Sequence, residues 1–269
     1  MRLNLHTHSN KSDGVFTPDE VVKIQADDKI DVMSLTDHDS VSGIDEAIGA
    51  GEKYGVKVLP GIELSCYSIC EIHILGYNFD YKNPEFIQEL KAIKDLRKLR
   101  ISKTIERLHE IGVPLDASSV DFENGNVGRV HVAKEMVRQG IVKSVSDAFN
   151  QYIGSGKRAY VQGYRLSPMD AVKLIKKFGG TAVLAHPVFI PSAKVELLVS
   201  GLISYGLDGL ECRYGSFNET DTARFLKMAD KYGLVATCGT DIHDKNTYVS
   251  PCYDPSATDA KCLKKLNLI

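Results

Sequence analysis

The sequence predicts an α/β fold of repeated strand–helix units, and two observations carry this prediction. Short apolar segments of strand length alternate with segments of helical periodicity before about residue 84 and again after about residue 165. Such alternation is typical of parallel βαβ units. Histidine and acidic residues gather at the ends of the predicted strands, where the active-site residues of a parallel barrel lie. The 269 residues suffice for one large domain or for a barrel with an insertion.

The composition is that of an ordinary globular protein, with 43% hydrophobic and 25% charged residues. A net charge of -2 indicates no general affinity for polyanions, so any phosphate contact must be local. No segment approaches the roughly 18 apolar residues of a membrane span, and the chain opens directly into a predicted strand, leaving no room for a signal peptide. Six cysteines without a CxxC pair favour a reducing compartment, and we expect a cytoplasmic protein; they are Cys66, Cys70, Cys212, Cys238, Cys252 and Cys262.

The first predicted strand covers residues 3–8, where apolar and polar residues alternate. His6 and His8 are two positions apart and therefore share one face of the strand. The turn-forming residues that follow bring Asp13 just past the strand end. Two imidazoles beside a carboxylate are half of a metal site. The alternative is a polar strand whose histidines face solvent.

The next elements follow from capping residues and periodicity. Thr17, Pro18 and Glu20 form a helix start with a capping box. We predict helices over residues 18–28 and 43–54, and strands over residues 30–35, 56–60 and 70–77.

A change of pattern begins at about residue 84, beyond which helical segments follow one another without a strand. We predict a helical insertion over residues 98–164 that caps the substrate, with helices at 118–140 and 144–152. The catalytic barrel then comprises residues 1–97 and 165–269. The insertion contains Arg129 and His131 at a predicted helix start, and Lys157 in a basic glycine-rich turn.

The βα pattern resumes in the C-terminal part of the chain. Ser167 caps a predicted helix that Pro168 opens. We predict helices over residues 167–178, 195–205 and 218–232, and strands over residues 181–185, 209–213 and 234–238.

The candidate metal ligands share one property, since they lie within or just after the C-terminal ends of predicted strands. In a parallel barrel these ends converge on one mouth. Six of the eight histidines lie there, whereas His109 is interpreted as a surface residue. Asp37 and Asp39 are interpreted as turn residues that do not ligate metal directly. The predicted ligands are His6, His8, Asp13, His38, Glu63, His73, His186, Asp241 and His243.

Nine nitrogen and oxygen ligands are too many for one ion, which binds about four to six including water. With a bridging carboxylate such as Glu63 they suit two or three divalent ions. Mixed imidazole and carboxylate ligands favour Mn, Fe or Zn over Mg or Ca. Clustered ions of this kind catalyse hydrolysis, because they activate water and neutralise the charge of a phosphoryl group.

Six motifs in this order resemble those of the PHP (polymerase and histidinol phosphatase) family: HTHSNKSDG, LTDHDSVSG, PGIELS, EIHILGY, LAHP and GTDIH. The resemblance extends over nearly the whole chain and is closest to the stand-alone branch of nucleotide phosphatases and short-RNA exonucleases. It implies a distorted seven-stranded (β/α) barrel with a trinuclear site for Mn, Fe or Zn, held by the nine ligands above. It also implies that Arg129 and His131 reach the substrate phosphate.

Two departures from the family pattern concern the substrate rather than the metals. Asp244 stands where the family often has a glycine, and the turn after Gly156 reads Lys157-Arg158 rather than a basic residue followed by proline. Without the resemblance, Arg129 would be interpreted as a surface ion pair at a helix start, and Lys157 as a solvated turn residue.

The predicted function is metal-dependent hydrolysis of phosphate from small nucleotides, either nucleoside monophosphates or 3',5'-bisphosphates, by metal-activated water. The alternatives are a 5'-to-3' exonuclease acting on short RNA, a histidinol-phosphate phosphatase, and a non-catalytic domain. We assign catalytic roles to Asp13, His186 and His243, and substrate binding to Arg129, His131 and Lys157. The expected partner is a small phosphorylated substrate, a nucleotide or short RNA end; no membrane or protein partner is implied.

Overall fold

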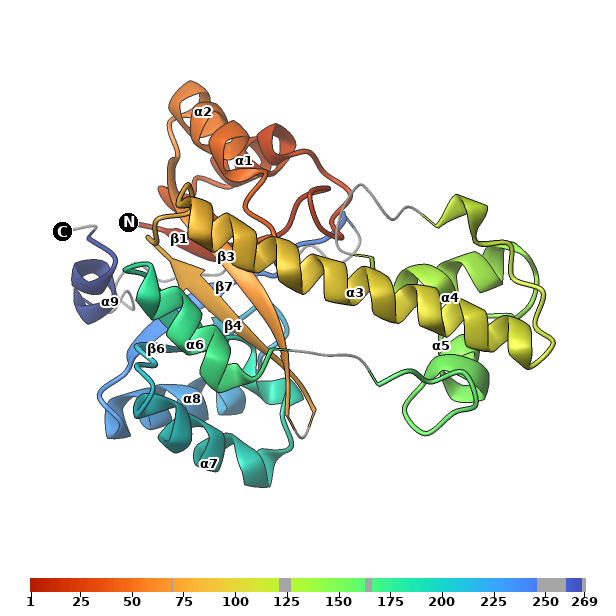
Figure 1. Ribbon diagram of the computed structural model, residues 1–269. Helices are drawn as coiled ribbons and strands as arrows, with labels where there is room; N and C mark the ends of the chain where they lie inside the picture. The colour runs from red at the N-terminus through yellow and green to blue at the C-terminus, as the bar shows by residue number, and fades with distance from the viewer. Residues whose placement is uncertain (69, 121–126, 163–165, 246–259, 268–269) are drawn as a thin grey trace. The chain divides into compact units, whose positions relative to one another are not determined.

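The computed structural model describes residues 1–68, 70–120, 127–162, 166–245 and 260–267 (Figure 1). The chain divides into two compact units, which we call the barrel unit (Met1–Ile87 and Leu166–Ile269) and the helical unit (Gln88–Arg165). The helical unit begins before the predicted residue 98, inside helix α3 (Pro84–Glu110). Its predicted role as a substrate cap stays a prediction.

The barrel unit contains one seven-stranded sheet in which the strands follow one another in chain order. The last strand returns to the first, where the Asp241 amide donates to the His6 carbonyl at 2.9 Å and the His8 amide to the Ile242 carbonyl at 3.1 Å. The sheet is therefore nearly closed, and the predicted (β/α) barrel is confirmed. The strands are β1 (Leu3–Thr7), β2 (Val32–Leu35), β3 (Lys57–Tyr67), β4 (Glu71–Tyr77), β5 (Thr181–Leu184), β6 (Gly209–Tyr214) and β7 (Val235–Gly239).

Strand β4 departs from the predicted parallel pattern, because it runs antiparallel to both β3 and β5. The short connection from Tyr67 to Glu71 explains the direction, since a tight connection joins antiparallel strands whereas parallel strands need a long crossover. Strand β3 is also longer than predicted, so Glu63 lies inside the strand rather than after it.

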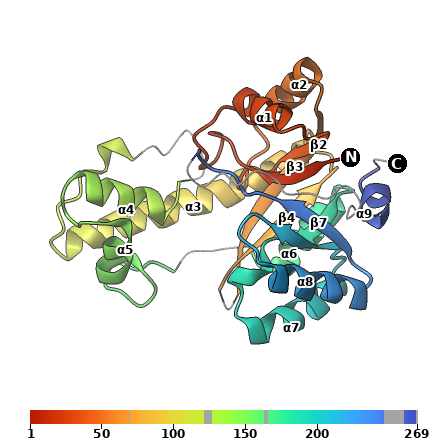
Figure 2. The ribbon, with the colours of Figure 1, turned by 180° about the vertical axis from the view of Figure 1, so that it is seen from behind.

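The barrel helices pack beside the strands that precede or follow them (Figures 1 and 2). Helices α1 and α2 contact β2 and β3, whereas α6 and α8 contact β3 to β7. The predicted capping box is present, as the Glu20 amide donates to Thr17 Oγ1 and the Thr17 amide to Glu20 Oε2. The helices are α1 (Pro18–Asp27), α2 (Ile44–Tyr54), α6 (Pro168–Lys177), α7 (Ser192–Ile203) and α8 (Glu219–Lys231), with a short 3₁₀ turn η3 (Pro187–Phe189).

A further helix, α9 (Ala260–Lys265), has no counterpart in the sequence prediction. Its Cys262 and the following Leu266 are buried against Leu3 and Val235, which are the first residues of β1 and β7. Helix α9 therefore contributes to the core at the strand-start end of the barrel.

The helical unit has a core of its own, which includes Leu108, Val132, Met136 and Ile153. The continuous helix predicted over residues 118–140 is wrong, because α4 begins only at Arg129 and residues 121–126 lie outside the described part of the chain. After α3 its elements are η1 (Ala117–Ser119), α4 (Arg129–Arg138), α5 (Val145–Ala148) and the π-helical turn η2 (Phe149–Ile153).

Within the described residues, no helix combines the length and apolar character that crossing a bilayer requires. No disulfide joins the five described cysteines, and Cys252 lies outside the described residues.

Candidate metal centre

His6 in β1 and His8 just after that strand are completely buried and face each other. All of β1 is buried, and the exposed fraction is 0% for both His6 and His8. Their Nε2 atoms are 3.1 Å apart. The alternative of a solvent-facing polar strand is therefore wrong.

His6 is oriented by a buried acidic residue that the sequence analysis did not identify. Its Nδ1 lies 3.1 Å from Glu211 Oε1, while Glu211 Oε2 accepts a 2.7 Å hydrogen bond from the His186 amide. An Nδ1–H donated to the carboxylate leaves the Nε2 lone pair pointing into the cluster, as in the carboxylate–histidine pairs of metal sites. The available signal was a lone acidic residue in the otherwise apolar start of β6.

Glu63 is the carboxylate around which the imidazoles gather. Its Oε2 lies 3.2 Å from His6 Nε2 and 3.1 Å from His8 Nε2. Its Oε1 lies 2.9 Å from His73 Nδ1 and 3.0 Å from His186 Nε2. One buried side chain thus contacts ligand candidates that precede the helical unit in the sequence and one that follows it.

His73 belongs to this group, but the prediction that it lies at the C-terminal end of its strand is wrong. It is the third residue of β4 and lies near the start of that strand, not at its C-terminal end. Because β4 is antiparallel to its neighbours, its beginning lies at the rim where β3 and β5 present Glu63 and His186.

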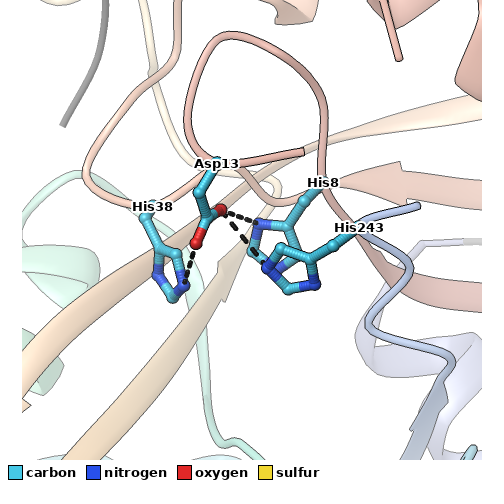
Figure 3. A group of neighbouring side chains, drawn as sticks. All are labelled: His8, Asp13, His38 and His243. Carbon is cyan, nitrogen blue, oxygen red and sulfur yellow. Dashed lines mark ion pairs between the residues drawn. The ribbon is translucent and has the colours of Figure 1, made fainter. Parts of the chain in front are cut away.

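Asp13 lies at the more exposed side of the cluster, among three imidazoles (Figure 3). Its Oδ1 is 3.3 Å from His243 Nε2 and 3.9 Å from His8 Nδ1, and its Oδ2 is 3.8 Å from His38 Nε2. The loop that carries it is fixed by Asp37, which accepts hydrogen bonds from the Ser9 amide and hydroxyl. Asp37 therefore has the structural role expected of a turn residue.

Asp241 completes the buried side of the cluster. Its Oδ1 lies 2.9 Å from His8 Nε2, and its Oδ2 accepts a 2.6 Å hydrogen bond from the Tyr214 hydroxyl, a contact that the sequence did not suggest. Both Asp241 and His186 adopt positive φ angles, 54° and 23°. Side chains other than glycine rarely adopt this conformation, and its occurrence at two cluster positions is typical of functional sites.

The buried carboxylates of the cluster act on the pKa values of the imidazoles beside them. Although burial opposes ionisation, Asp241 and Glu63 raise the pKa of His8 to about 10. Burial likewise opposes charge on His73, but Glu63 raises its pKa to about 10. For His38 burial prevails and lowers the pKa to about 4. The carboxylates thus favour positive charge beside them, which a bound cation would supply.

The arrangement fits metal ions. Glu63 Oε2 and Asp241 Oδ1 are buried without a hydrogen-bond partner among the described residues, although imidazole nitrogens lie within 3.3 Å of each. Ligand atoms bonded at about 2.0–2.2 Å to one ion lie roughly 3.0–3.6 Å from one another, which is similar. Three groups of ligand atoms meet within 4.8 Å: His8, Asp13, His38 and His243; His6, His8, Glu63 and Asp241; and His38, Glu63 and His73.

Two further histidines lie outside these three ligand groups. His186 contacts Glu63 and His73 at 3.0 and 3.2 Å but belongs to none of these three groups. His109 is exposed on α3, as expected.

Three predicted substrate residues lie in the helical unit. Arg129 donates from Nη1 to the Ile153 carbonyl at 3.1 Å, and His131 Nδ1 accepts from the Gly128 amide at 3.0 Å, which caps α4. Lys157 is exposed in its turn. Their role in substrate binding stays a prediction.

A nearly closed α/β barrel with histidine and carboxylate side chains clustered at one rim defines the class of barrel hydrolases that depend on metal ions. The model of the PHP domain matches residues 4–185, and the chain belongs to the PHP family. The resemblance inferred from the motifs is thereby confirmed.

Two relatives are similar over most of their length. A 5'-3' exoribonuclease of Haemophilus influenzae is 32% identical over 90% of both chains. A 3',5'-nucleoside bisphosphate phosphatase of Chromobacterium violaceum is 33% identical over 90% of this chain and 87% of its own.

Two solved structures share the fold. An amidohydrolase from Chromobacterium violaceum with bound sulfate has a TM-score of 0.85 at 30% identity, over 99% of this chain and 96% of its own. A metal-dependent phosphoesterase from Bifidobacterium adolescentis has a TM-score of 0.80 at 25% identity, over 99% and 95%. The protein is thus a metal-dependent phosphoesterase, a hydrolase of phosphoester bonds.

Proposed function

We propose that the protein removes phosphate from small nucleotides, namely nucleoside monophosphates or 3',5'-bisphosphates. The observation that carries the proposal is the meeting of three ligand groups, linked through His8, His38 and Glu63, at one rim of the barrel. The bisphosphate phosphatase of Chromobacterium violaceum supports the choice of substrate, because this chain covers 87% of it at 33% identity.

The residues that would hold two or three Mn, Fe or Zn ions are the nine predicted ligands, with Glu63 as the shared carboxylate. Such ions, when bound, supply an activated water and neutralise charge on the phosphoryl group. Glu211 would keep His6 in the orientation that ligation needs, and Tyr214 would do the same for Asp241.

Asp13 and His243 are the cluster residues best placed to meet a phosphate arriving from solution, since their side chains are 38% and 29% exposed. Burial lowers the pKa of His243 but Asp13 raises it, with a net increase, so the two side chains favour positive charge between them, which a bound ion would supply. Together with His186, these are the residues to which we assign catalytic roles.

Arg129 is the residue of the helical unit that we propose for phosphate binding, because a guanidinium binds phosphate oxygens in pairs. His131 and Lys157 are proposed to assist it. We also place the protein in the cytoplasm, where nucleotides and short RNA ends are its expected substrates.

A second candidate function is 5'-to-3' exonuclease activity on short RNA, favoured by the similarity to the exoribonuclease of Haemophilus influenzae. It uses the same hydrolytic chemistry but needs room for more than one nucleotide. Histidinol-phosphate phosphatase is a third possibility with a substrate that is not a nucleotide.

Product release from a substrate panel by Mn-loaded protein tests these proposals, with phosphate measured for every substrate and 5'-mononucleotide also measured for the RNA. The panel contains 5'-AMP, adenosine 3',5'-bisphosphate, histidinol phosphate and a 5'-phosphorylated RNA trimer. We expect release from the nucleotides, a loss of about 100-fold or more in Asp13→Ala, and normal rates in the surface variant His109→Gln. Phosphate released from the bisphosphate and mononucleotide released from the trimer distinguish phosphatase from exonuclease, and the absence of both products would refute both.

A further inference from the structure

We propose that the exposed ring of Phe189 is a stacking platform for the base of the nucleotide whose phosphate is hydrolysed at the cluster. This inference rests on the proposed function and names the group that the site recognises beyond the phosphate. The base belongs either to a mononucleotide or to the first nucleotide of a short RNA.

Phe189 is exposed although the turn that carries it is firmly anchored. Its exposed fraction is 61%, whereas Ile190 beside it is 4% exposed and Pro187 is buried. The Phe189 amide donates to the His186 carbonyl at 3.2 Å, and the Ile190 amide donates to the Pro187 carbonyl at 3.2 Å. Proline also fixes the backbone at the start of the turn. The ring is thus presented to solvent from a rigid support.

The ring lies directly beside the cluster. Its centroid is 5.2 Å from that of His186, whose Nε2 is 3.0 Å from Glu63 Oε1. It meets Tyr214 edge to face at 5.9 Å, and Tyr214 in turn lies 5.2 Å from Phe217. Phe189 and Tyr214 therefore both lie against the His186 ring, and the aromatic contacts continue through Phe217 to the buried Phe225, which supports the platform from below.

An aromatic face next to a phosphate site suits a nucleobase, because every base has a π-face that stacks on aromatic side chains. The Tyr214 hydroxyl is engaged with Asp241, which holds this ring in place behind Phe189. Leu197 of α7 offers a comparison, since it is 69% exposed but aliphatic and lines a hollow together with Met169 and Tyr205. It serves as the matched control.

Base-free substrates test the inference by activity. The value of kcat/KM is measured for adenosine 3',5'-bisphosphate and for 1-deoxyribose 3,5-bisphosphate, which lacks the base. We expect Phe189→Ala to reduce the preference for the base at least about fivefold, mainly through KM. Phe189→Tyr and Leu197→Ala should leave the preference unchanged. A second pair of substrates, the RNA trimer with and without its first base, shows whether the recognised base belongs to an RNA end.

Fluorescence gives a readout that does not depend on turnover. The chain contains no tryptophan, so Phe189→Trp introduces a single tryptophan at the platform, which can be excited at wavelengths that the tyrosines do not absorb. We expect AMP to quench this emission on mixing and ribose 5-phosphate to leave it unchanged.

The outcomes separate the two proposals. Equal base preference in wild type and Phe189→Ala, with phosphate still released, would overturn the platform and leave the proposed function intact. If wild type releases no phosphate, the proposed function fails, and quenching by AMP alone then decides the platform. Equal quenching by AMP and ribose 5-phosphate, or no quenching by either, would overturn the platform.

Discussion

Glu211 illustrates how one buried side chain determines what its neighbours can do. Its two oxygens contact the His6 ring and the His186 backbone, and its exposed fraction is 0%. It contacts no ion in the proposed arrangement, yet it fixes which nitrogen of His6 faces the cluster. Metal binding depends on residues that orient the ligands as well as on the ligands themselves.

We expect Glu211→Gln to weaken metal binding about 10- to 100-fold, because the neutral amide holds the His6 ring less strongly. Competition with a coloured chelator measures the change. Glu219→Gln, an exposed position at the start of α8, should bind metal like wild type. Unchanged affinity in Glu211→Gln would show that His6 is oriented by other contacts.

Among the elements, β7 and β1 approach each other closely at the site. A Cβ at Gly239 would lie 2.1 Å from His6 Cβ and 2.8 Å from Glu211 Oε1, so no larger residue fits there. The glycine thus lets the last strand approach the first and brings Asp241 next to His8.

We expect Gly239→Ala to reduce the free energy of unfolding by about 1–3 kcal/mol and to impair metal binding, because the methyl group displaces His6. Gly49→Ala in α2 is the matched control, since nothing lies within 4 Å of the added Cβ. It should instead stabilise the protein by about 0.5–1 kcal/mol. Urea denaturation of both variants measures the two changes in the free energy of unfolding, which should have opposite signs.

Asp208 connects three elements of the barrel unit. Its Oδ2 accepts from Lys176 Nζ of α6 at 2.7 Å and from the Ala182 amide of β5 at 2.9 Å, and its Oδ1 contacts Lys265 of α9 at 2.7 Å. Burial alone would raise the pKa of Asp208. The hydrogen bonds and charges of these partners lower it by a larger amount, so the net shift is downward.

This shift predicts a stability difference that depends on pH. A carboxyl group with a lowered folded-state pKa stabilises the fold above its unfolded pKa of about 3.9, and the contribution disappears as the pH falls through the folded-state pKa. Asp208→Asn should therefore cost about 1–2 kcal/mol at pH 7, and the difference from wild type should shrink below about pH 4. Thermal unfolding from pH 7 to pH 3 tests this, with the exposed Asp230→Asn as control; a constant difference would contradict it.

At the scale of the whole molecule, the cluster joins the two ends of the barrel sequence. Asp13 and Glu63 come from the N-terminal part of the chain, whereas His186 and Asp241 come from the part after the helical unit. A cation bound among them would hold both parts together only in the folded state, because the ligands are far apart in the unfolded chain.

Metal loading should therefore raise the melting temperature. At a free Mn concentration about 100 times the dissociation constant, we expect an increase of roughly 5–10 °C that a chelator reverses. The increase should be retained in His109→Gln and reduced in Glu63→Gln. The same increase in Glu63→Gln would place the bound ion elsewhere.

The sequence by itself determined the class of fold and the set of candidate ligands. Alternating apolar patterns report burial on one face, and the motifs bring histidine and carboxylate residues to strand ends, so both can be recognised from local spacing. Local spacing says nothing about strand direction or about partners distant in sequence. The tertiary structure therefore decided that β4 is antiparallel, which alone brings His73 to the rim.

The tertiary structure likewise decided the surroundings of the ligands. Glu211 is an ordinary acidic residue in the sequence and acquires its role because β6 places it behind His6. Phe189 looks like a core residue, and only the turn after β5 leaves its ring exposed beside the cluster. Composition and periodicity are set residue by residue, whereas burial and contact between distant segments arise only when the barrel closes.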